Sequence, residues 1–183
     1  MVGDGRTSLA IHHDGVAARG RADQAGAVTS PDEALPPIEE VVPHRPPMLL
    51  IDRVCAHGDD MAVSTVAIRA DSPFVVAGPD GQLGVPAVVG IEYMAQTVAA
   101  YAGLSARKEK RAPRIGFLLG CRELSLGTDA FAVGEILTIE VRRVFGESDL
   151  GSFNCTVTAP DGRTLASGSL TVYQGPLPEG MSI

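Results

Sequence analysis

One segment constrains the fold of this chain more than any other: residues 84–103, which read GVPAVVGIEYMAQTVAAYAG. Apolar residues recur in it at steps of three and four, the spacing of one face of an α-helix. The pattern predicts a long helix over residues 87–106, with Pro86 just before it and Gly103 near its end. Because most of its side chains are small, a sheet can wrap closely around it.

The sequence on both sides of this helix predicts strands. Two are expected before it, at residues 48–58 and 61–70, and four after it, at 116–124, 135–145, 151–160 and 163–174. The turn sequence HGDD joins the first two, and the segments FVVAGPDGQLGVP and TDAFAVG are predicted as loop and turn. Consecutive strands joined by tight turns pair antiparallel, and one helix against such a sheet gives an α+β architecture.

The predicted domain covers residues 36–175 and opens with a short helical turn in PPIEEVV. Residues 1–35 are rich in Gly, Ala, Asp and Arg without a period, so we expect a disordered N-terminal tail, and residues 176–183 form a short C-terminal tail. The sequence has no internal repeat and no nucleotide-binding glycine motif.

The net charge of −7 argues against nucleic-acid or anionic-membrane partners. No run approaches the roughly 18 apolar residues of a membrane span, and the first residues hold no apolar stretch of signal-peptide length, so we expect a cytoplasmic protein. Cys55, Cys121 and Cys155 lack metal-ligand spacing, so we expect three small buried apolar residues and neither a metal site nor a disulfide.

Glu92 is the unusual residue of the predicted helix. Gln96 follows four residues later, so both side chains leave the same face. A glutamate near a helix N-terminus can simply complement the macrodipole. Burial among Val, Ile, Met and Ala would instead raise its pKa and suit it to act as a general acid.

His44 is the histidine best placed to act as a base. The chain has four histidines, of which His12 and His13 lie in the predicted tail and His57 lies in a turn that we expect to be solvated. His44 stands in the rigid loop VPHRPPM beside an apolar strand. The alternative is that His44 only packs within or hydrogen-bonds its own loop.

The ordered motifs resemble a known family. PPIEEVVPHRPPMLLIDRV is similar to the opening of the hotdog-fold 3-hydroxyacyl-acyl-carrier-protein dehydratases, and GIEYMAQTVAAYAG resembles their central helix. GSFNCTVTAPDGRTLASGSLTVYQ resembles the end of the aryl-polyene-type branch, and the resemblance covers about residues 36–175.

The resemblance implies a hotdog fold, with a sheet around the helix and an active site at a dimer interface. It implies dehydration of a 3-hydroxyacyl chain, carried by acyl carrier protein, to the trans-2-enoyl thioester in fatty-acid-like or polyene biosynthesis, without metal or organic cofactor. Glu92 matches the acidic residue of the family's central helix. Ala87 matches the position whose backbone N–H points at the thioester carbonyl.

These expectations define a mechanism. His44 would take the C2 proton, Glu92 would protonate the leaving hydroxyl, and Gln96 would orient Glu92 or a water. The N–H groups of Ala87 and Val88 would hold the thioester oxygen.

The surroundings of this site yield two further expectations. Small residues beside Met94 and Val98 would leave a tunnel for the acyl chain. A basic patch could attract an acidic carrier protein by electrostatic steering. The alternative is an ordinary solvated helix end, where cations suit the helix dipole. The patch consists of Arg107, Lys108, Lys110, Arg111 and Arg114.

Two alternatives remain open. A hotdog thioesterase places a carboxylate on the same helix but uses it to activate water. The chain can also be a non-catalytic partner in a dimer with another hotdog subunit, because the loop VVAGPDGQLGVPA has no histidine where the main fatty-acid dehydratases carry GHFPG.

Overall fold

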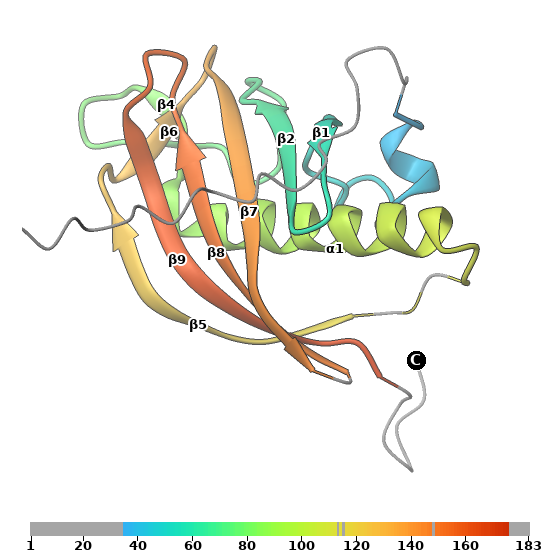
Figure 1. Ribbon diagram of the computed structural model, residues 1–183. Coiled ribbons are helices and arrows are strands. Elements are labelled where there is room, and N and C mark those ends of the chain that lie inside the picture. The colour runs from blue at the N-terminus through green and yellow to red at the C-terminus, as the bar shows by residue number, and fades with distance from the viewer. Residues whose placement is uncertain (1–34, 113, 115, 148, 176–183) are drawn as a thin grey trace, which may run out of the picture.

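The computed structural model describes residues 35–112, 114, 116–147 and 149–175 (Figure 1). The expected tails, apart from Leu35, therefore lie outside the described residues. The elements in chain order are η1 Ile38–Glu40, β1 Arg53–His57, β2 Met61–Ala67, β3 Val76–Ala77, β4 Leu83–Pro86, η2 Ala87–Val89, α1 Gly90–Lys108, β5 Phe117–Leu126, β6 Ala130–Ala132, β7 Ile136–Glu147, β8 Leu150–Thr158 and β9 Thr164–Tyr173.

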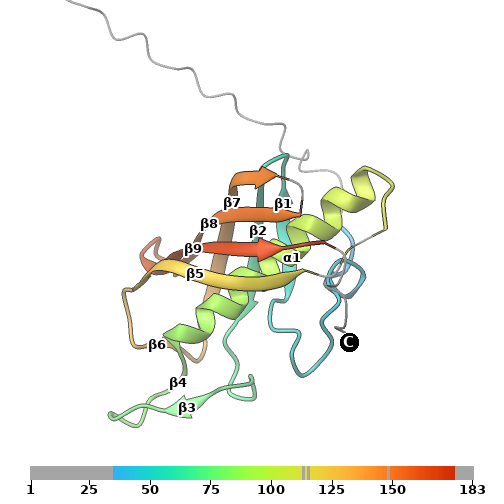
Figure 2. The same ribbon diagram turned by 90° about the horizontal axis from the view of Figure 1, so that it is seen from below.

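Six strands form one antiparallel sheet in the order β1-β2-β7-β8-β9-β5. The sheet curls around α1, which crosses its concave side, and β5 curves beneath the helix (Figures 1 and 2). This arrangement confirms the predicted α+β hotdog fold. Among the described residues, no helix is long and apolar enough to cross a membrane.

The core lies where the inward residues of the strands meet one face of α1. On β7, Leu137, Ile139 and Val141 alternate with more exposed neighbours and are fully buried, as expected for a strand with one covered face. From α1, the side chains of Met94 and Tyr101 pack into the same cluster. The 19-residue helix is therefore held mainly by burial of one face.

The first strand is shorter than predicted, because β1 begins only at Arg53. Leu50 and Ile51 use their backbone N–H groups to bond the side chain of Gln96 on α1. Those groups are then not available for a sheet partner. The segment before β1 is thus fastened to the helix instead of the sheet.

Three short strands, β3, β4 and β6, form a small second sheet in segments predicted as loop and turn. They are two to four residues long, too short to show a period. At Gly84, a Cβ would lie 2.7 Å from the Phe131 carbonyl oxygen. Glycine here permits close approach of β4 and β6, and does not mark a loop.

The cysteines differ from their predicted environment. Cys155 is buried, and burial raises the pKa of its thiol to about 12. Cys121 is half-buried and Cys55 is exposed. The expectation of three buried cysteines was therefore wrong for Cys55, whose side chain points outward from the edge strand β1.

Candidate active site

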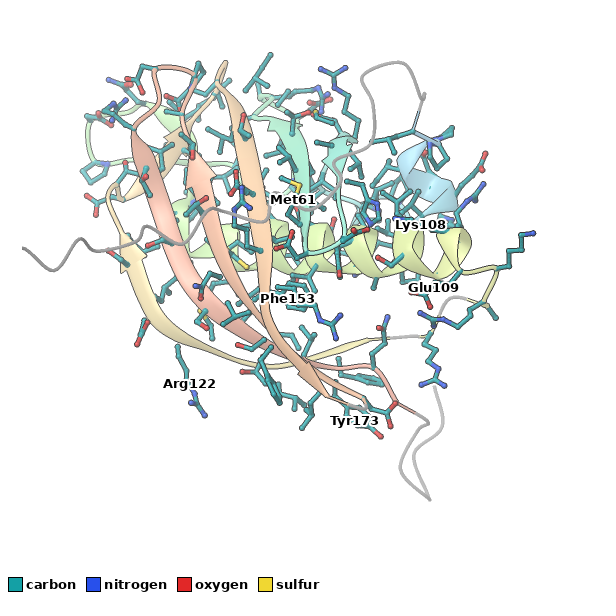
Figure 3. All side chains as sticks on the ribbon, viewed as in Figure 1. Met61, Lys108, Glu109, Arg122, Phe153 and Tyr173 are labelled. Carbon is teal, nitrogen blue, oxygen red and sulfur yellow. The ribbon has the colours of Figure 1, made fainter. Side chains whose placement is uncertain are left out.

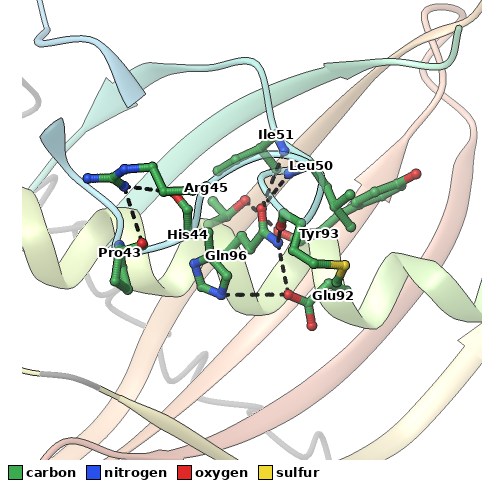
Figure 4. Close-up of polar contacts among 10 residues, drawn as sticks. Pro43, His44, Arg45, Leu50, Ile51, Glu92, Tyr93 and Gln96 are labelled. Carbon is green, nitrogen blue, oxygen red and sulfur yellow. Dashed lines mark hydrogen bonds and ion pairs between the residues drawn. The ribbon is translucent and has the colours of Figure 1, made fainter. Parts of the chain in front are cut away.

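The segment between η1 and β1 lies along α1 and is fastened to it by Gln96 (Figure 4). The Gln96 amide oxygen accepts from the N–H groups of Leu50 at 2.9 Å and Ile51 at 3.4 Å. Its amide nitrogen donates to the Met48 carbonyl at 2.7 Å and to Glu92 Oε1 at 2.8 Å. One fully buried side chain therefore holds both the loop and the carboxylate.

His44 and Glu92 meet within one chain. His44 Nε2 lies 3.8 Å from Glu92 Oε1, and the two side chains are 33% and 36% exposed. Of the two environments that the sequence allowed for Glu92, the structure shows a partly exposed carboxylate in the first turns of α1 rather than one buried among apolar residues. His44 Nδ1 is buried and has no hydrogen-bond partner among the described residues. His44 Nε2 and the Glu92 carboxylate are therefore both accessible to a ligand.

Arg45 shapes the loop that carries His44. Its Nη1 donates to three consecutive carbonyl groups, those of Val42 at 3.0 Å, Pro43 at 3.2 Å and His44 at 2.7 Å. Carbonyls that would otherwise repel one another converge on one cation. Sequence reasoning missed this role, for which the only signal was an arginine within a proline-rich loop.

The N-terminal turn of the helix holds the two other predicted residues. Ala87 is buried, and its N–H donates to the Asp129 carbonyl at 2.9 Å. Val88 follows it, with an exposed side chain one turn from Glu92. The N–H of Val88 belongs to the first turn, whose amides lack an acceptor within the helix. The structure therefore leaves the Val88 amide better placed than the Ala87 amide to receive an oxygen.

His57 was expected to be solvated, and this was wrong. It ends β1, is 5% exposed, and its Nε2 lies 3.1 Å from Ser105 Oγ on α1. Burial is the main cause that lowers the pKa of its imidazole below the usual 6.5. His57 thus joins β1 to α1 as a neutral ring.

A cleft of about 780 Å³ begins beside His44 and follows α1 toward its C-terminal end. Ala95, Val98, Ala99 and Ala102 form its helix side. Val98 was predicted to border such a space, whereas Met94 is fully buried in the core on another face. Figure 3 shows Phe153 of β8 beneath α1, with Lys108 and Glu109 at the end of the helix.

The predicted basic patch is largely neutralised by carboxylates of the same chain. Arg107 is 3.4 Å from Glu40 and Lys108 is 2.8 Å from Asp59. Two similar pairs, with separations of 2.6 and 2.9 Å, follow the helix: Arg111–Glu109 and Arg114–Asp149. Such exposed pairs contribute little to stability, but they reduce the net positive charge of this surface.

Comparison with known proteins identifies the family of this chain. The family model described as ApeP-like, ApeP dehydratase, matches residues 36–182. The chain belongs to the ApeP-like dehydratase family. The match includes the PHR loop, the Glu92 helix and every strand of the hotdog sheet.

Individual relatives of this ApeP-like chain are also dehydratases. Over 138 residues it is 28% identical to the 3-hydroxyacyl-acyl-carrier-protein dehydratase FabZ of Streptococcus equi subsp. zooepidemicus, covering 75% of this chain and 95% of that protein. It is 33% identical over 84 residues to FabZ of Anaeromyxobacter sp. (strain K), covering 45% of this chain and 54%, about half, of that relative.

A solved structure shares the fold. The dehydratase heterocomplex ApeI:P from Xenorhabdus doucetiae superimposes with a TM-score of 0.71 at 29% identity, covering 78% of this chain and 93% of the matched chain.

Proposed function

We propose that this ApeP-like chain eliminates water from a 3-hydroxyacyl thioester, carried by acyl carrier protein, to give the trans-2-enoyl thioester. The observation that carries the proposal is the contact of His44 with Glu92 at 3.8 Å, at the start of the cleft. A base and an acid so close together can act on the neighbouring C2 and C3 of one substrate.

In this mechanism His44 Nε2 takes the proton from C2. The electron pair of the C–H bond forms the C2–C3 double bond, the C3–O bond breaks, and protonated Glu92 gives its proton to the leaving hydroxyl, which departs as water. His44 then carries one proton more and Glu92 one fewer. Transfer between the two side chains, directly or through water, restores the starting state, so that no cofactor enters the balance.

Backbone groups would stabilise the charge that develops on the thioester oxygen. The N–H groups of Ala87 and Val88 stand at the helix N-terminus, where the macrodipole favours negative charge. Val88 is the better donor, because Ala87 already bonds Asp129. Gln96 would hold Glu92 Oε1 through its bond of 2.8 Å and leave the other carboxylate oxygen to meet the substrate.

The chain would work with a second hotdog subunit joined along β5. This strand is an edge of the six-stranded sheet, so one side of its backbone has no strand partner among the described residues. Its Leu119 is 60% exposed. A partner edge would satisfy the backbone groups and cover this apolar surface.

One observation favours a division of labour between unlike subunits. The similar solved structure is a heterocomplex, and the segment before α1 in this chain has no histidine where the main fatty-acid dehydratases carry GHFPG. The second candidate is therefore a subunit that is inactive alone and active with a partner. Activity that appears only when the partner is added would identify this case.

The test compares variants with a 3-hydroxyacyl-carrier substrate, following the absorbance of the conjugated enoyl product. Glu92→Gln and His44→Ala are each expected to lower kcat by on the order of 100-fold or more. Glu140→Gln is the matched control, because Glu140 is 39% exposed, close to the 36% of Glu92, but lies on β7. Near-normal rates for both site variants would refute the assigned roles, and release of free thiol without enoyl product would indicate a thioesterase.

A further inference from the structure

Arg45 is bonded to the chain on both sides of its own position in the His44 loop. Its guanidinium Nη1 donates to the carbonyl groups of the three residues before it, including that of His44 at 2.7 Å. Its own carbonyl oxygen accepts from the N–H groups of two residues after it, Met48 at 2.9 Å and Leu49 at 3.0 Å. One residue therefore fixes the path of the loop before and after the histidine.

These bonds continue to the carboxylate of the site. The Gln96 amide nitrogen donates to the Met48 carbonyl at 2.7 Å and to Glu92 Oε1 at 2.8 Å. The contact of Glu92 Oε1 with His44 Nε2, at 3.8 Å, then closes a ring (Figure 4). The members of this ring are His44, Arg45, Met48, Gln96 and Glu92. The acid and the base are therefore held by one continuous set of polar contacts.

The place of Arg45 separates it from residues that hold the core. Its side chain is exposed, so that shortening it opens no cavity in the core. Arg45 makes no ion pair among the described residues, and its charge is directed to the three carbonyl groups. Hydrogen bonds from a charged donor are roughly twice as strong as those between neutral groups. The guanidinium thus acts on the course of the loop.

We propose that Arg45 is a positioning residue for the dehydration, which sets the distance between His44 and Glu92 through this ring. The inference rests on the proposed function and adds a residue to it. An acid and a base must reach neighbouring carbon atoms of one substrate, and a displacement of about 1 Å can cost on the order of 100-fold in rate. Without the cation, the three carbonyl groups would turn apart and carry the His44 ring with them.

Arg45→Met removes every donor of the side chain and keeps part of its apolar stem. We expect kcat with the 3-hydroxyacyl-carrier substrate to fall by on the order of 100-fold, while KM changes little, because Arg45 acts on His44 and not on the substrate. Arg45→Lys keeps the charge on a flexible stem and should give a kcat between those of the wild type and Arg45→Met. Arg163→Met is the control, since Arg163 is exposed and pairs only with Asp161 of its own turn.

Guanidinium ion supplies a readout that a purely structural role would not move. In Arg45→Ala the place of the missing group is open to solvent, so the free ion can occupy it. At concentrations far below those that unfold proteins, the ion should raise kcat of Arg45→Ala by on the order of tenfold, the scale of one charge-assisted hydrogen bond. It should leave the rates of Arg163→Ala and His44→Ala unchanged.

The ring also predicts that Arg45 and Gln96 act as one unit. The double variant Arg45→Met/Gln96→Met should then have the kcat of the slower single variant, whereas two independent residues would multiply their losses. The rates are compared per folded molecule, because Gln96→Met also removes hydrogen bonds of buried groups.

Four results would each overturn the proposal. They are a wild-type kcat in Arg45→Met, a change confined to KM, a kcat of Arg45→Ala that guanidinium ion does not raise, and multiplied losses in the double variant. Failure of the proposed function has a different signature, which is a normal rate of enoyl formation in His44→Ala. A slow His44→Ala beside a normal Arg45→Met would leave the reaction standing and remove only the positioning role.

Discussion

Gly103 of α1 and Val41 of the η1 segment touch so closely that a Cβ at position 103 would overlap the Val41 carbonyl oxygen. Seven residues before Gly103 along the helix, Gln96 fastens the loop again by hydrogen bonds to Met48, Leu50 and Ile51. His44 lies between these two attachments. The helix thus fixes the position of the base as well as that of the acid.

Gly103→Ala should displace the His44 loop. The overlap forces η1 outward, at a cost of about 1–3 kcal/mol of unfolding free energy, which outweighs the gain of about 1 kcal/mol in helix propensity. We expect kcat to fall by on the order of 100-fold if His44 moves by about 1 Å. Enzyme assays and denaturant unfolding measure the two effects separately.

The control for this change is Gly116→Ala, where an added Cβ would meet its nearest neighbour, the Tyr173 carbonyl oxygen, at an ordinary 3.7 Å. It should leave kcat unchanged. If both variants behave alike, or if Gly103→Ala retains full activity, the contact with Val41 does not position His44.

Gln96→Met should destabilise the fold. Methionine has a similar volume but leaves the buried Leu50 N–H and the Met48 carbonyl without their partner. The expected loss is about 2–4 kcal/mol, measured by urea unfolding. Gln82→Met, at an exposed position, is the control. Equal urea midpoints for Gln96→Met and Gln82→Met would show that water replaces the hydrogen bonds made by the Gln96 side chain.

Acidification should weaken the fold through His57. Because burial lowers the pKa of His57 in the folded state below 6.5, the unfolded chain binds the proton more readily. The contribution of His57 to the free energy of unfolding is fully present above pH 6.5. It is lost as the pH falls from 6.5 through the lower pKa of His57 in the folded state. Lys108 opposes protonation further, while the backbone of Tyr101 and the carboxylate of Asp59 favour it.

Thermal unfolding between pH 7.5 and 5 measures this dependence. The Tm of the wild type should fall on the acidic side, and that of His57→Gln should fall less. The two proteins differ only at position 57, so the difference between the two curves isolates His57. Parallel curves would show that the buried ring does not couple folding to pH.

Leu119→Lys should weaken association with a second hotdog subunit, because it places a charge on the exposed edge strand β5. We expect at least about a tenfold rise in Kd, equivalent to about 1.4 kcal/mol, measured by sedimentation of the chain alone and with its partner. Ile136→Lys is the control, since Ile136 is 57% exposed and Leu119 is 60% exposed. Equal effects would place the interface elsewhere.

The main elements could be predicted because each has enough residues to show a period. The helix was predicted over residues 87–106, and η2 and α1 cover 87–108. The strands around Ile139 and Leu170 were also recognisable, since one face of each is buried. The meeting of His44 with Glu92 could be suggested only by elimination and by the family resemblance, and the structure brings the two side chains together.

The remaining features depend on contacts between distant segments. Nothing local in the sequence indicates that Gln96 bonds residues 46 positions away, or that Gly103 admits the Val41 carbonyl. His57 follows a strand and precedes a turn, but Ser105 and Tyr101 cover it from the helix. Three cations of the predicted patch meet carboxylates from distant segments where the chain folds back, as Arg114 meets Asp149.

The small residues of α1 have a consequence for how such a chain can change over generations. Ala95, Ala99 and Ala102 line the cleft, while Met94 and Leu104 pack into the core from the other side of the same helix. A substitution on the first group alters what the cleft admits without opening a cavity in the core. The positions that shape the cleft and the positions that fill the core therefore lie largely on different sides of one helix, so the two can vary largely independently.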